Sequence, residues 1–313
     1  MTNPKVSVIV TTYNRAHMVT ETIDSILDQT FKDFELIVVD NYSADNTEEV
    51  VKSYTDERIR YFKHQNNGII AVNRNYGINQ AQSEYIAFCD DDDLWYPEKL
   101  EKCLEIFRQN KDIILVCHDE NVSYNGKIIR VDICGTYVEP VYYDLLFSGN
   151  RIFTSAVVVR RDTLLRADGF NENPGFFGVE DWDLWMRLAT VGKFYFLHEI
   201  LGQYRIHGSA YSYDVEKRTR HSLNVVEHHF KHLPTDERRK HERKIKKVKA
   251  AILFGGGWGN LRRGEFFRAQ NWFKEGIQVY PFSFRNYIGL TLALFRICPP
   301  QGMVKAVKAI TGK

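Results

Sequence analysis

The chain has 313 residues, 44% of them hydrophobic and 26% charged, which is the composition of a folded globular protein and excludes a disordered or fibrous one. Its formal net charge of +2 conceals a division, because residues 1–213 carry 21 basic and 32 acidic side chains whereas residues 214–313 carry 21 and 8. This asymmetry predicts two regions with different partners and excludes a uniform nucleic-acid binder, since the larger, acidic region would repel phosphate.

The apolar run at the N-terminus is too short, and gives way to polar residues too soon, for a signal peptide. Short apolar runs then alternate with segments of helical periodicity in the first part of the chain. The expected strands are Val6–Val10, Phe34–Val39, Ile59–Phe62 and Tyr85–Cys89, and the expected helices run through Val19–Leu27, Val50–Tyr54 and Ile70–Ala81. This alternation predicts right-handed βαβ units, and therefore an α/β fold with a mostly parallel sheet covered on both faces. Ligands of such sheets bind at the carboxyl ends of the strands.

Polar residues follow three of the four expected strands. Thr11–Arg15 follow the first strand, Asp40 follows the second, and Asp90–Asp93 follow the fourth. The sequence contains neither a GxxxxGK[ST] loop nor a GxGxxG loop after the first strand. It therefore excludes a P-loop nucleotide site and disfavours a dinucleotide-binding fold.

The four consecutive aspartates Asp90–Asp93 are the strongest chemical signal in the sequence. A solvated acidic loop is the default interpretation of such a charge run. Here, however, the run directly follows a buried strand and precedes the apolar segment Leu94–Pro97, where mutual repulsion is costly without a cation. Mg²⁺ and Mn²⁺ bind carboxylate and phosphate oxygens together. The cluster therefore predicts a divalent metal site that presents the cation to a diphosphate.

The last third of the chain predicts basic helices. A helix is expected over Glu216–Lys249, with a solvated face as the default role of its many Lys and Arg side chains. The pattern from Gly264 to Pro281 matches half of one tetratricopeptide repeat, and a single repeat cannot bury its own face. It therefore predicts a helical hairpin packed on the catalytic domain and not a repeat array. The glycine-rich segment Gly255–Gly259 follows a helical pattern and is not expected to contact a ligand.

The apolar segment Tyr287–Phe295 is too short to cross a bilayer, which needs roughly 20 apolar residues. Together with its basic neighbours, this segment suits binding to an anionic membrane surface. A packed interface with another domain or subunit explains the same pattern, and the sequence does not decide between the two. Nucleic acid is not expected as a partner, because no recognition motif accompanies the charge. The five cysteines form no CxxC pair, which predicts buried free thiols in a reducing compartment; they are Cys89, Cys103, Cys117, Cys134 and Cys298.

Six segments together resemble family-2 inverting glycosyltransferases, in the order and at the spacings of that family. They are Val6–Arg15, Val38–Ser43, Asn73–Asn75, Ile86–Leu100, Gly178–Arg187 and Tyr204–His207. The resemblance spans residues 5 to about 210 and implies a GT-A fold, with a Rossmann-like sheet flanked by helices. It implies a catalytic domain over residues 1–213, with nucleotide-sugar binding over about 1–118 and the acceptor side over about 119–213. A basic helical extension follows at 214–313.

The same resemblance implies roles for residues on the donor side. Asp40 matches a carboxylate that hydrogen-bonds the uracil of the donor, and Arg74 matches a basic side chain beside the nucleotide. Aligned on Trp95 and Pro97, Asp90–Asp92 form a DxD element in which Asp90 faces the ribose and Asp92 ligates the metal, while Asp91 and Asp93 fill the flanking places. The extra aspartate also permits a register shifted by one residue. Thr12 and Asn14, in the first matching segment, are expected to bind substrate.

Glu180–Asp183 would by default form the first turn of a helix, where acidic side chains interact favourably with the helix dipole. The resemblance implies more, because an inverting transfer needs a base to take the proton of the acceptor hydroxyl. In similar enzymes the second residue of this acidic pair is the base, which here is Asp181, while Glu180 and Asp183 orient the base or the acceptor. Arg205 and His207 match an element that contacts the diphosphate, and His207 is also expected as a metal ligand.

The implied activity is transfer of a sugar, a hexose or N-acetylhexosamine from a UDP-sugar, to an acceptor hydroxyl with Mn²⁺ or Mg²⁺ as cofactor. The expected acceptor is a glycan, a lipid-linked glycan or a protein in cell-envelope assembly, and the expected location is the cytoplasm or the inner face of the plasma membrane. A sugar nucleotidylyltransferase is the alternative enzyme, but it should carry a GxGTR-type loop where this chain has Thr11–Arg15. A non-catalytic sugar-nucleotide-binding protein would tolerate loss of Asp181, which is present.

Overall fold

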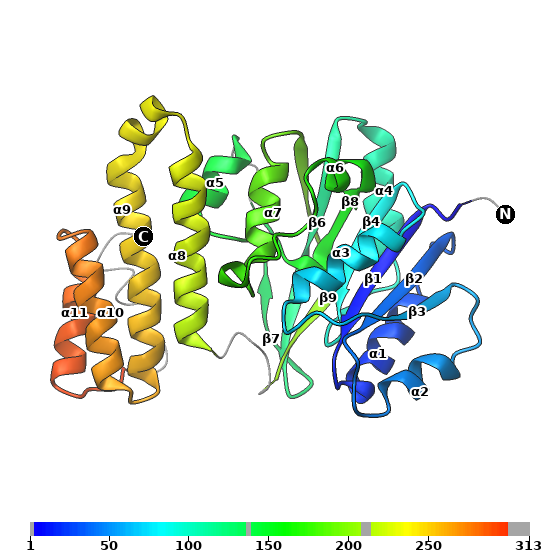
Figure 1. Cartoon of the computed structure of the whole chain (residues 1–313), viewed down its shortest axis with the longest axis horizontal. Helices are drawn as coiled ribbons and strands as arrows, with labels where there is room; N and C mark the ends of the chain where they lie inside the picture. Colours follow the sequence, from blue (N-terminus) through cyan, green and yellow to red (C-terminus); the bar gives the residue numbers. More distant parts are fainter. Residues whose placement is uncertain (1–2, 136–138, 208–213, 300–313) are drawn as a thin grey trace. The chain divides into compact units, whose positions relative to one another are not determined.

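The computed structural model describes residues 3–135, 139–207 and 214–299, which form two compact units (Figure 1). The first unit lies within Met1–Leu145 and Gly149–Ala210, and the second within Leu146–Ser148 and Tyr211–Lys313. Within the described residues, no helix combines the length and the apolar composition that spanning a bilayer requires.

The first unit is built on one mixed sheet, which has nine strands among the described residues. The strand order is β3-β2-β1-β4-β8-β6-β9-β5, with β7 paired to β6. The strands are β1 Val6–Thr12, β2 Phe34–Asp40, β3 Ile59–Lys63, β4 Tyr85–Asp90, β5 Leu94–Trp95, β6 Ile113–Tyr124, β7 Lys127–Asp132, β8 Val157–Arg160 and β9 Lys193–Ile206. Pairing is parallel from β3 through β4, as the alternation of strands and helices predicts, and antiparallel between β4 and β8.

Helices cover both faces of this sheet. The helices with residues in this unit are α1 Ala16–Leu27, α2 Thr47–Ser53, α3 Ile70–Gln80, α4 Lys99–Gln109, α5 Val141–Ser148, α6 Arg161–Arg166 and α7 Glu180–Leu188, with 3₁₀ turns η1 Thr154–Ala156 and η2 Pro174–Phe176. Because side chains alternate across a strand, Val8 and Val10 pack in one core cluster with Ile23 of α1, whereas Ile9 faces Gly77 of α3 on the opposite side. The α/β class and each element expected before residue 91 are confirmed.

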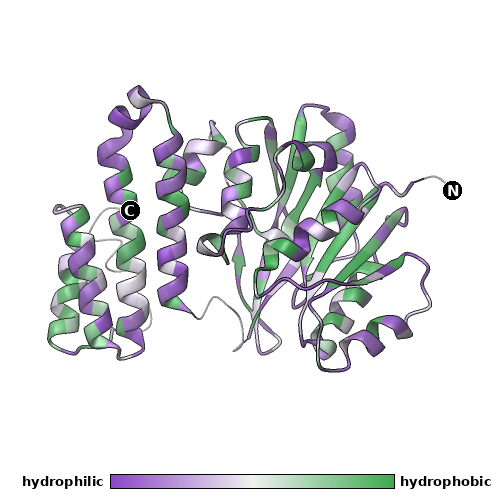
Figure 2. Ribbon diagram, in the orientation of Figure 1, coloured by the Kyte–Doolittle hydropathy of each residue, from purple (hydrophilic) through white to green (hydrophobic). Residues whose placement is uncertain are grey.

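The second unit is helical and contains α8 Val215–His232, α9 Thr235–Arg262, α10 Phe266–Val279 and α11 Phe284–Leu294, together with the last three residues of α5. The expectation of one continuous helix over Glu216–Lys249 is wrong, because the chain turns at Leu233 and Pro234. Proline lacks an amide hydrogen and disfavours helical backbone in the residue before it, so α8 ends there and α9 begins after it. In Figure 2 the first half of α9 is mostly hydrophilic, in keeping with its Lys and Arg content.

The glycine-rich segment lies inside α9, as expected, and lets that helix pack closely. A Cβ atom at Gly256 would lie 2.7 Å from Oγ1 of Thr219 in α8, and one at Gly257 would lie 2.5 Å from the ring of Phe273 in α10. Gly255, by contrast, has nothing within 4 Å of the same position. The segment therefore serves helix packing in the second unit.

The cysteines are free thiols, as predicted, and four of them are buried. Cys298 is exposed, so the expectation of burial is wrong for this one residue.

Gly257→Ala should destabilise the protein by about 1–3 kcal/mol, because the added methyl group overlaps the Phe273 ring in a packed core. Gly255→Ala in the same helix is the matched control and should be neutral or stabilising by up to about 1 kcal/mol. Urea denaturation followed by circular dichroism measures both. Equal midpoints for the two variants would contradict the packing role of Gly257.

Candidate active site

The candidate site lies at the carboxyl ends of the parallel strands. In the register of the sheet, Thr12 at the end of β1 lies beside Asp40 at the end of β2, and Thr11 lies beside Asp90 at the end of β4. Parallel pairing therefore gathers residues that are far apart in the sequence at the edge where ligands of open α/β sheets bind.

Asp40 is buried, and both of its carboxylate oxygens accept hydrogen bonds. Oδ1 accepts from the backbone N–H and the hydroxyl of Ser43 at 2.9 and 2.6 Å, and Oδ2 accepts from the Tyr61 hydroxyl at 2.5 Å. Burial and the bond to Asp40 raise the pKa of Tyr61 above its ordinary value, so its hydroxyl remains a donor. Asn14, with a φ of 52°, accepts from the Ala44 N–H at 2.7 Å and ties the end of β1 to the segment after β2.

Asp90 ends β4, and the other three aspartates form the turn after it. The carboxylates of Asp90, Asp92 and Asp93 offer oxygens that all lie within 4.8 Å of one another. A set of oxygen donors alone is what hard cations such as Mg²⁺ and Mn²⁺ prefer, so these residues fit the divalent metal that the sequence predicts. The group contains Asp90 and Asp92 of the expected DxD element and adds Asp93.

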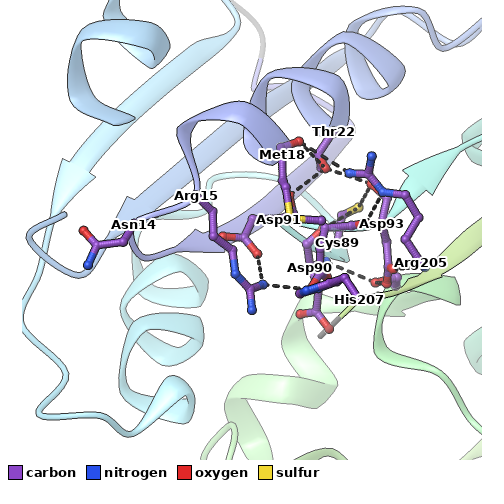
Figure 3. Close-up of polar contacts among 12 residues, drawn as sticks. Asn14, Arg15, Met18, Thr22, Cys89, Asp90, Asp91, Asp93, Arg205 and His207 are labelled. Atoms are coloured by element: carbon purple, nitrogen blue, oxygen red, sulfur yellow. Dashed lines mark hydrogen bonds and ion pairs between the residues drawn. The ribbon is translucent and has the colours of Figure 1, made fainter. Parts of the chain in front are cut away.

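Two basic side chains approach this cluster from distant parts of the chain (Figure 3). One guanidinium nitrogen of Arg15 lies 2.7 Å from Oδ1 of Asp91 and 2.7 Å from Oδ2 of Asp92. Nε2 of His207 lies 2.7 Å from the same oxygen of Asp92. Burial raises the pKa of Asp91 to about 6, although the charge of Arg15 opposes this shift. Asp92 is thus the aspartate at which both basic side chains converge.

Asp93 is buried and bonded through both oxygens. Oδ2 accepts from the Ser155 hydroxyl at 2.5 Å, and Oδ1 accepts from the backbone N–H of Arg205 at 3.1 Å. Burial, with a contribution from the charge of Asp92, raises the pKa of Asp93 well above its ordinary range. The guanidinium of Arg205 donates to the backbone carbonyl of Asp92 and to the carboxylate of Glu21, so this side chain holds the turn against α1. Its contact with a diphosphate stays a prediction.

Arg74 of α3 is buried between two carboxylates that come from distant elements. Its guanidinium lies 2.6 Å from Oδ1 of Asp90 and 2.6 Å from Oε1 of Glu180, the first residue of α7. Burial alone would lower the pKa of Arg74, but the charges of Asp90 and Glu180 raise it above its ordinary value, so the side chain stays cationic. Arg74 therefore connects the acidic cluster to the start of α7.

Asp181, the second residue of α7, is partly exposed. Its Oδ2 accepts from the amide of Asn150 at 3.0 Å and from the Thr154 hydroxyl at 3.2 Å, and its Oδ1 accepts from the Trp182 N–H at 2.6 Å. Burial and the charge of Glu180 raise its pKa to about 7. A carboxylate with a pKa near neutrality is well matched to proton abstraction at physiological pH.

The structure brings most of the predicted site residues together. Asp90, Asp91, Asp92, Arg205 and His207 lie in one network with Arg15, and Arg74 and Glu180 extend it to Asp181. Thr12 and Asp40 lie on adjacent strand ends of the same edge. Asn14 is exposed and points away from the aspartates (Figure 3).

Several residues of this network are not among those predicted from the sequence. Arg15 lies within a recognised segment but received no role, although the density of aspartates signals that a cation must offset them. Tyr61, Asn150, Thr154 and Ser155 reach the site through tertiary contacts, and no local pattern in the sequence marks them.

A second group of metal-type side chains, Asp119, Cys134 and His198, also occurs in the described part of the chain. The thiol of Cys134 lies 3.5 Å from the Cys117 carbonyl. Its interaction with Cys117 and its burial raise its pKa well above the ordinary value, which disfavours the thiolate that a metal ion needs. We assign no metal to this group.

Comparisons with known sequences agree with the geometry. The family model described as "Glycosyl transferase family 2" matches residues 7–156. The chain is 31% identical over 211 residues to the putative teichuronic acid biosynthesis glycosyltransferase TuaG of Bacillus subtilis, covering 66% of this chain and 81% of that protein. It is 34% identical over 217 residues to an uncharacterized glycosyltransferase of Rickettsia typhi, covering 66% of this chain and 65% of that protein. An uncharacterized glycosyltransferase of Rickettsia felis is covered over only 39% of its length.

Solved structures show the same fold at low sequence identity. S. aureus TarS 1-349 in complex with UDP-GlcNAc gives a TM-score of 0.66 at 18% identity, over 93% of this chain and 88% of that one. A mannosyltransferase from Pyrobaculum calidifontis in complex with GDP-Man and Mn²⁺ gives a TM-score of 0.60 at 17% identity, covering 99% of this chain and 88% of that one. The expected GT-A fold is thereby confirmed.

Arg74→Ala should destabilise the protein by about 3–5 kcal/mol, because it leaves a buried carboxylate, Glu180, without its cation. Arg166→Ala is the control, since that exposed side chain pairs with Asp162 and should contribute only about 0–1 kcal/mol. Urea denaturation compares the two variants. A loss for Arg74→Ala no larger than that of the control would show that the buried bridge is not a structural requirement.

Proposed function

The chain belongs to glycosyl transferase family 2, and on this basis we propose that it is an inverting, metal-dependent glycosyltransferase. One observation carries the proposal: Arg74 bonds both Asp90 of the acidic cluster and Glu180, the neighbour of Asp181. A group of metal-type oxygens and a carboxylate with a pKa near 7 thus belong to one connected network.

The partly exposed carboxylate of Asp181 would take the proton of the acceptor hydroxyl as its oxygen attacks the anomeric carbon. The bond to the leaving diphosphate breaks on the opposite face of the sugar, so the configuration inverts and no covalent intermediate with the protein is needed. General-base catalysis of this kind contributes on the order of 10²–10⁴-fold. Asn150, Thr154 and the Trp182 N–H orient the carboxylate for this step.

Asp90 and Asp92, with Asp93 and His207 beside them, would hold the divalent cation. Such an ion supplies Lewis-acid stabilisation of the charge on the leaving diphosphate. Arg15 and Arg74 limit repulsion among the carboxylates through their ion pairs.

The donor we propose is a UDP-sugar that carries a hexose or N-acetylhexosamine, with the uracil hydrogen-bonded by Asp40. In support, a structural neighbour is solved with UDP-GlcNAc, while another holds GDP-Man and makes a GDP-sugar the second candidate. A relative named for teichuronic acid biosynthesis favours a cell-surface polysaccharide as the product. Thr12, Asn14, Arg205 and His207 are proposed to bind the donor.

We also propose that catalysis takes place in the cytoplasm, at the inner face of the plasma membrane. The support is the basic region at 214–313, with 21 basic and 8 acidic side chains, which suits an anionic surface. On α9, Arg239, Arg243 and Lys247 are exposed. Packing in an oligomer is the alternative role of this region.

UDP with Mn²⁺ should stabilise the protein, by about 2.7 kcal/mol when UDP is present at about 100 times its Kd. Thermal unfolding with UDP alone, Mn²⁺ alone and both together measures this. Asp92→Ala should lose the part of the shift that depends on Mn²⁺, whereas Asp112→Ala, on an exposed side chain, should retain it. No shift with UDP or GDP in the presence of Mn²⁺ would contradict the proposed function.

The rate of donor hydrolysis should rise with pH up to a plateau above about pH 7. The base must be deprotonated to act, and burial places the pKa of Asp181 at about 7. Asp181→Asn should lower turnover on the order of 10²–10⁴-fold while nucleotide binding persists. Asp162→Asn, at an exposed site on α6, is the control. Turnover retained in Asp181→Asn would mean that another group is the base.

A further inference from the structure

The 3₁₀ turn η1 lies between the two chemical groups of the site, and neighbouring residues of the turn contact each of them. We propose that Thr154 and Ser155 are positioning residues that fix the acidic cluster and Asp181 relative to each other. In a 3₁₀ turn successive side chains are a third of a turn apart, so neighbours project in different directions. This inference rests on the proposed function, because it concerns the same site.

Ser155 organises the acidic cluster through its hydroxyl group. The hydroxyl donates to Oδ2 of Asp93 at 2.5 Å and accepts from the backbone N–H of Asp90 at 3.1 Å. A single oxygen atom therefore joins the end of strand β4 to the last aspartate of the turn. Ser155 is buried, so water cannot easily replace these bonds.

Two buried hydrogen-bond donors fix the backbone of Ser155. Its carbonyl oxygen accepts from Nε1 of Trp95 at 2.9 Å and from Nζ of Lys99. Nζ of Lys99 also lies 3.3 Å from the centre of the Trp95 ring, a cation–π contact in a buried setting. This anchoring fixes η1, so the turn can act as a reference point for both groups of the site.

Thr154, one residue earlier, donates from its hydroxyl to Oδ2 of Asp181 at 3.2 Å. The amide of Asn150 donates to the same oxygen at 3.0 Å. The carboxylate of Asp181 is thus oriented from η1 and the segment before it, while Arg74 fixes its neighbour Glu180. Sites held within about half an ångström of productive geometry depend on such supporting contacts.

Mn²⁺ binding, measured from the electron paramagnetic resonance of the free ion without nucleotide, tests the role of Ser155. Ser155→Ala should weaken Mn²⁺ binding by about tenfold or more, since loss of a supporting partner commonly costs 10–100-fold in metal affinity. Ser155→Cys, which keeps the shape but offers only a weak donor, should show the same direction and provides a second variant if the alanine form is unstable.

Ser83→Ala is the matched control for these variants. Ser83 is also buried and hydrogen-bonded, to the Tyr85 carbonyl at 2.6 Å, but it lies at the opposite end of β4. Its Mn²⁺ affinity should equal that of the wild type. Equal affinities for Ser155→Ala and Ser83→Ala would overturn the inference and leave the proposed function intact, whereas absence of Mn²⁺ binding by the wild type would overturn the metal dependence itself.

Thr154→Val tests the other side of the turn, because it removes the hydroxyl with little change of shape. Its Mn²⁺ affinity and KM should match the wild type, while kcat for hydrolysis of UDP-GlcNAc or GDP-mannose, whichever the wild type uses, should fall by about ten- to a hundredfold. Thr154→Ser, which restores the hydroxyl, should recover most of kcat. An unchanged kcat in Thr154→Val, or a loss that Thr154→Ser shares, would overturn the role of Thr154.

Discussion

The architecture of the site depends on one constraint, the crowding of six carboxylates near the end of β4. Asp90–Asp93 follow one another along the chain, and Glu180 and Asp181 join them from α7. Several of these groups are buried, where a charge without a partner is strongly destabilising. Cations and hydrogen-bond donors from separate elements pair with these carboxylates. They are Arg15 after β1, Arg74 in α3, the backbone N–H of Arg205 in β9 and the hydroxyls of η1. Satisfying the acidic cluster therefore brings the elements of the site together.

The same contacts divide the carboxylates into chemical classes. Asp90 and Asp92 are paired with cations and suit metal coordination, whereas the donors that Asp181 has within the described residues are neutral, and its pKa rises to about 7. Enzymes commonly give nearby acidic groups different roles by placing them in environments that separate their pKa values. Arg74 is central to this difference, because its guanidinium pairs with both Asp90 and Glu180, while burial of Asp181 outweighs the opposing effect of the Arg74 charge on the pKa of that carboxylate.

Much of this could be predicted from the sequence, because strands and helices such as Val6–Thr12 and Ile70–Gln80 carry strong periodic patterns, and because four adjacent aspartates imply a cation. Pro234 also carried a local signal, which the expectation of a continuous helix ignored. Ser155 and Thr154 could not be predicted, since their partners in the site lie at least 27 positions away and small hydroxyl residues have no distinctive pattern. Arg15 was predictable only in part. It belongs to the segment Val6–Arg15 that carries the family resemblance, but its ion pairs depend on the register of β1 against β4.

In the proposed mechanism, Asp181 acts as a base in a single displacement at the anomeric carbon. Proton NMR, recorded immediately after mixing the wild-type protein with Mn²⁺ and UDP-GlcNAc or GDP-mannose, reports the configuration of the released sugar before it equilibrates. Because both donors are α-linked, a single displacement should release the β-anomer first. Initial release of the α-anomer would contradict it, since retention requires either a covalent intermediate or attack from the same face as the leaving group.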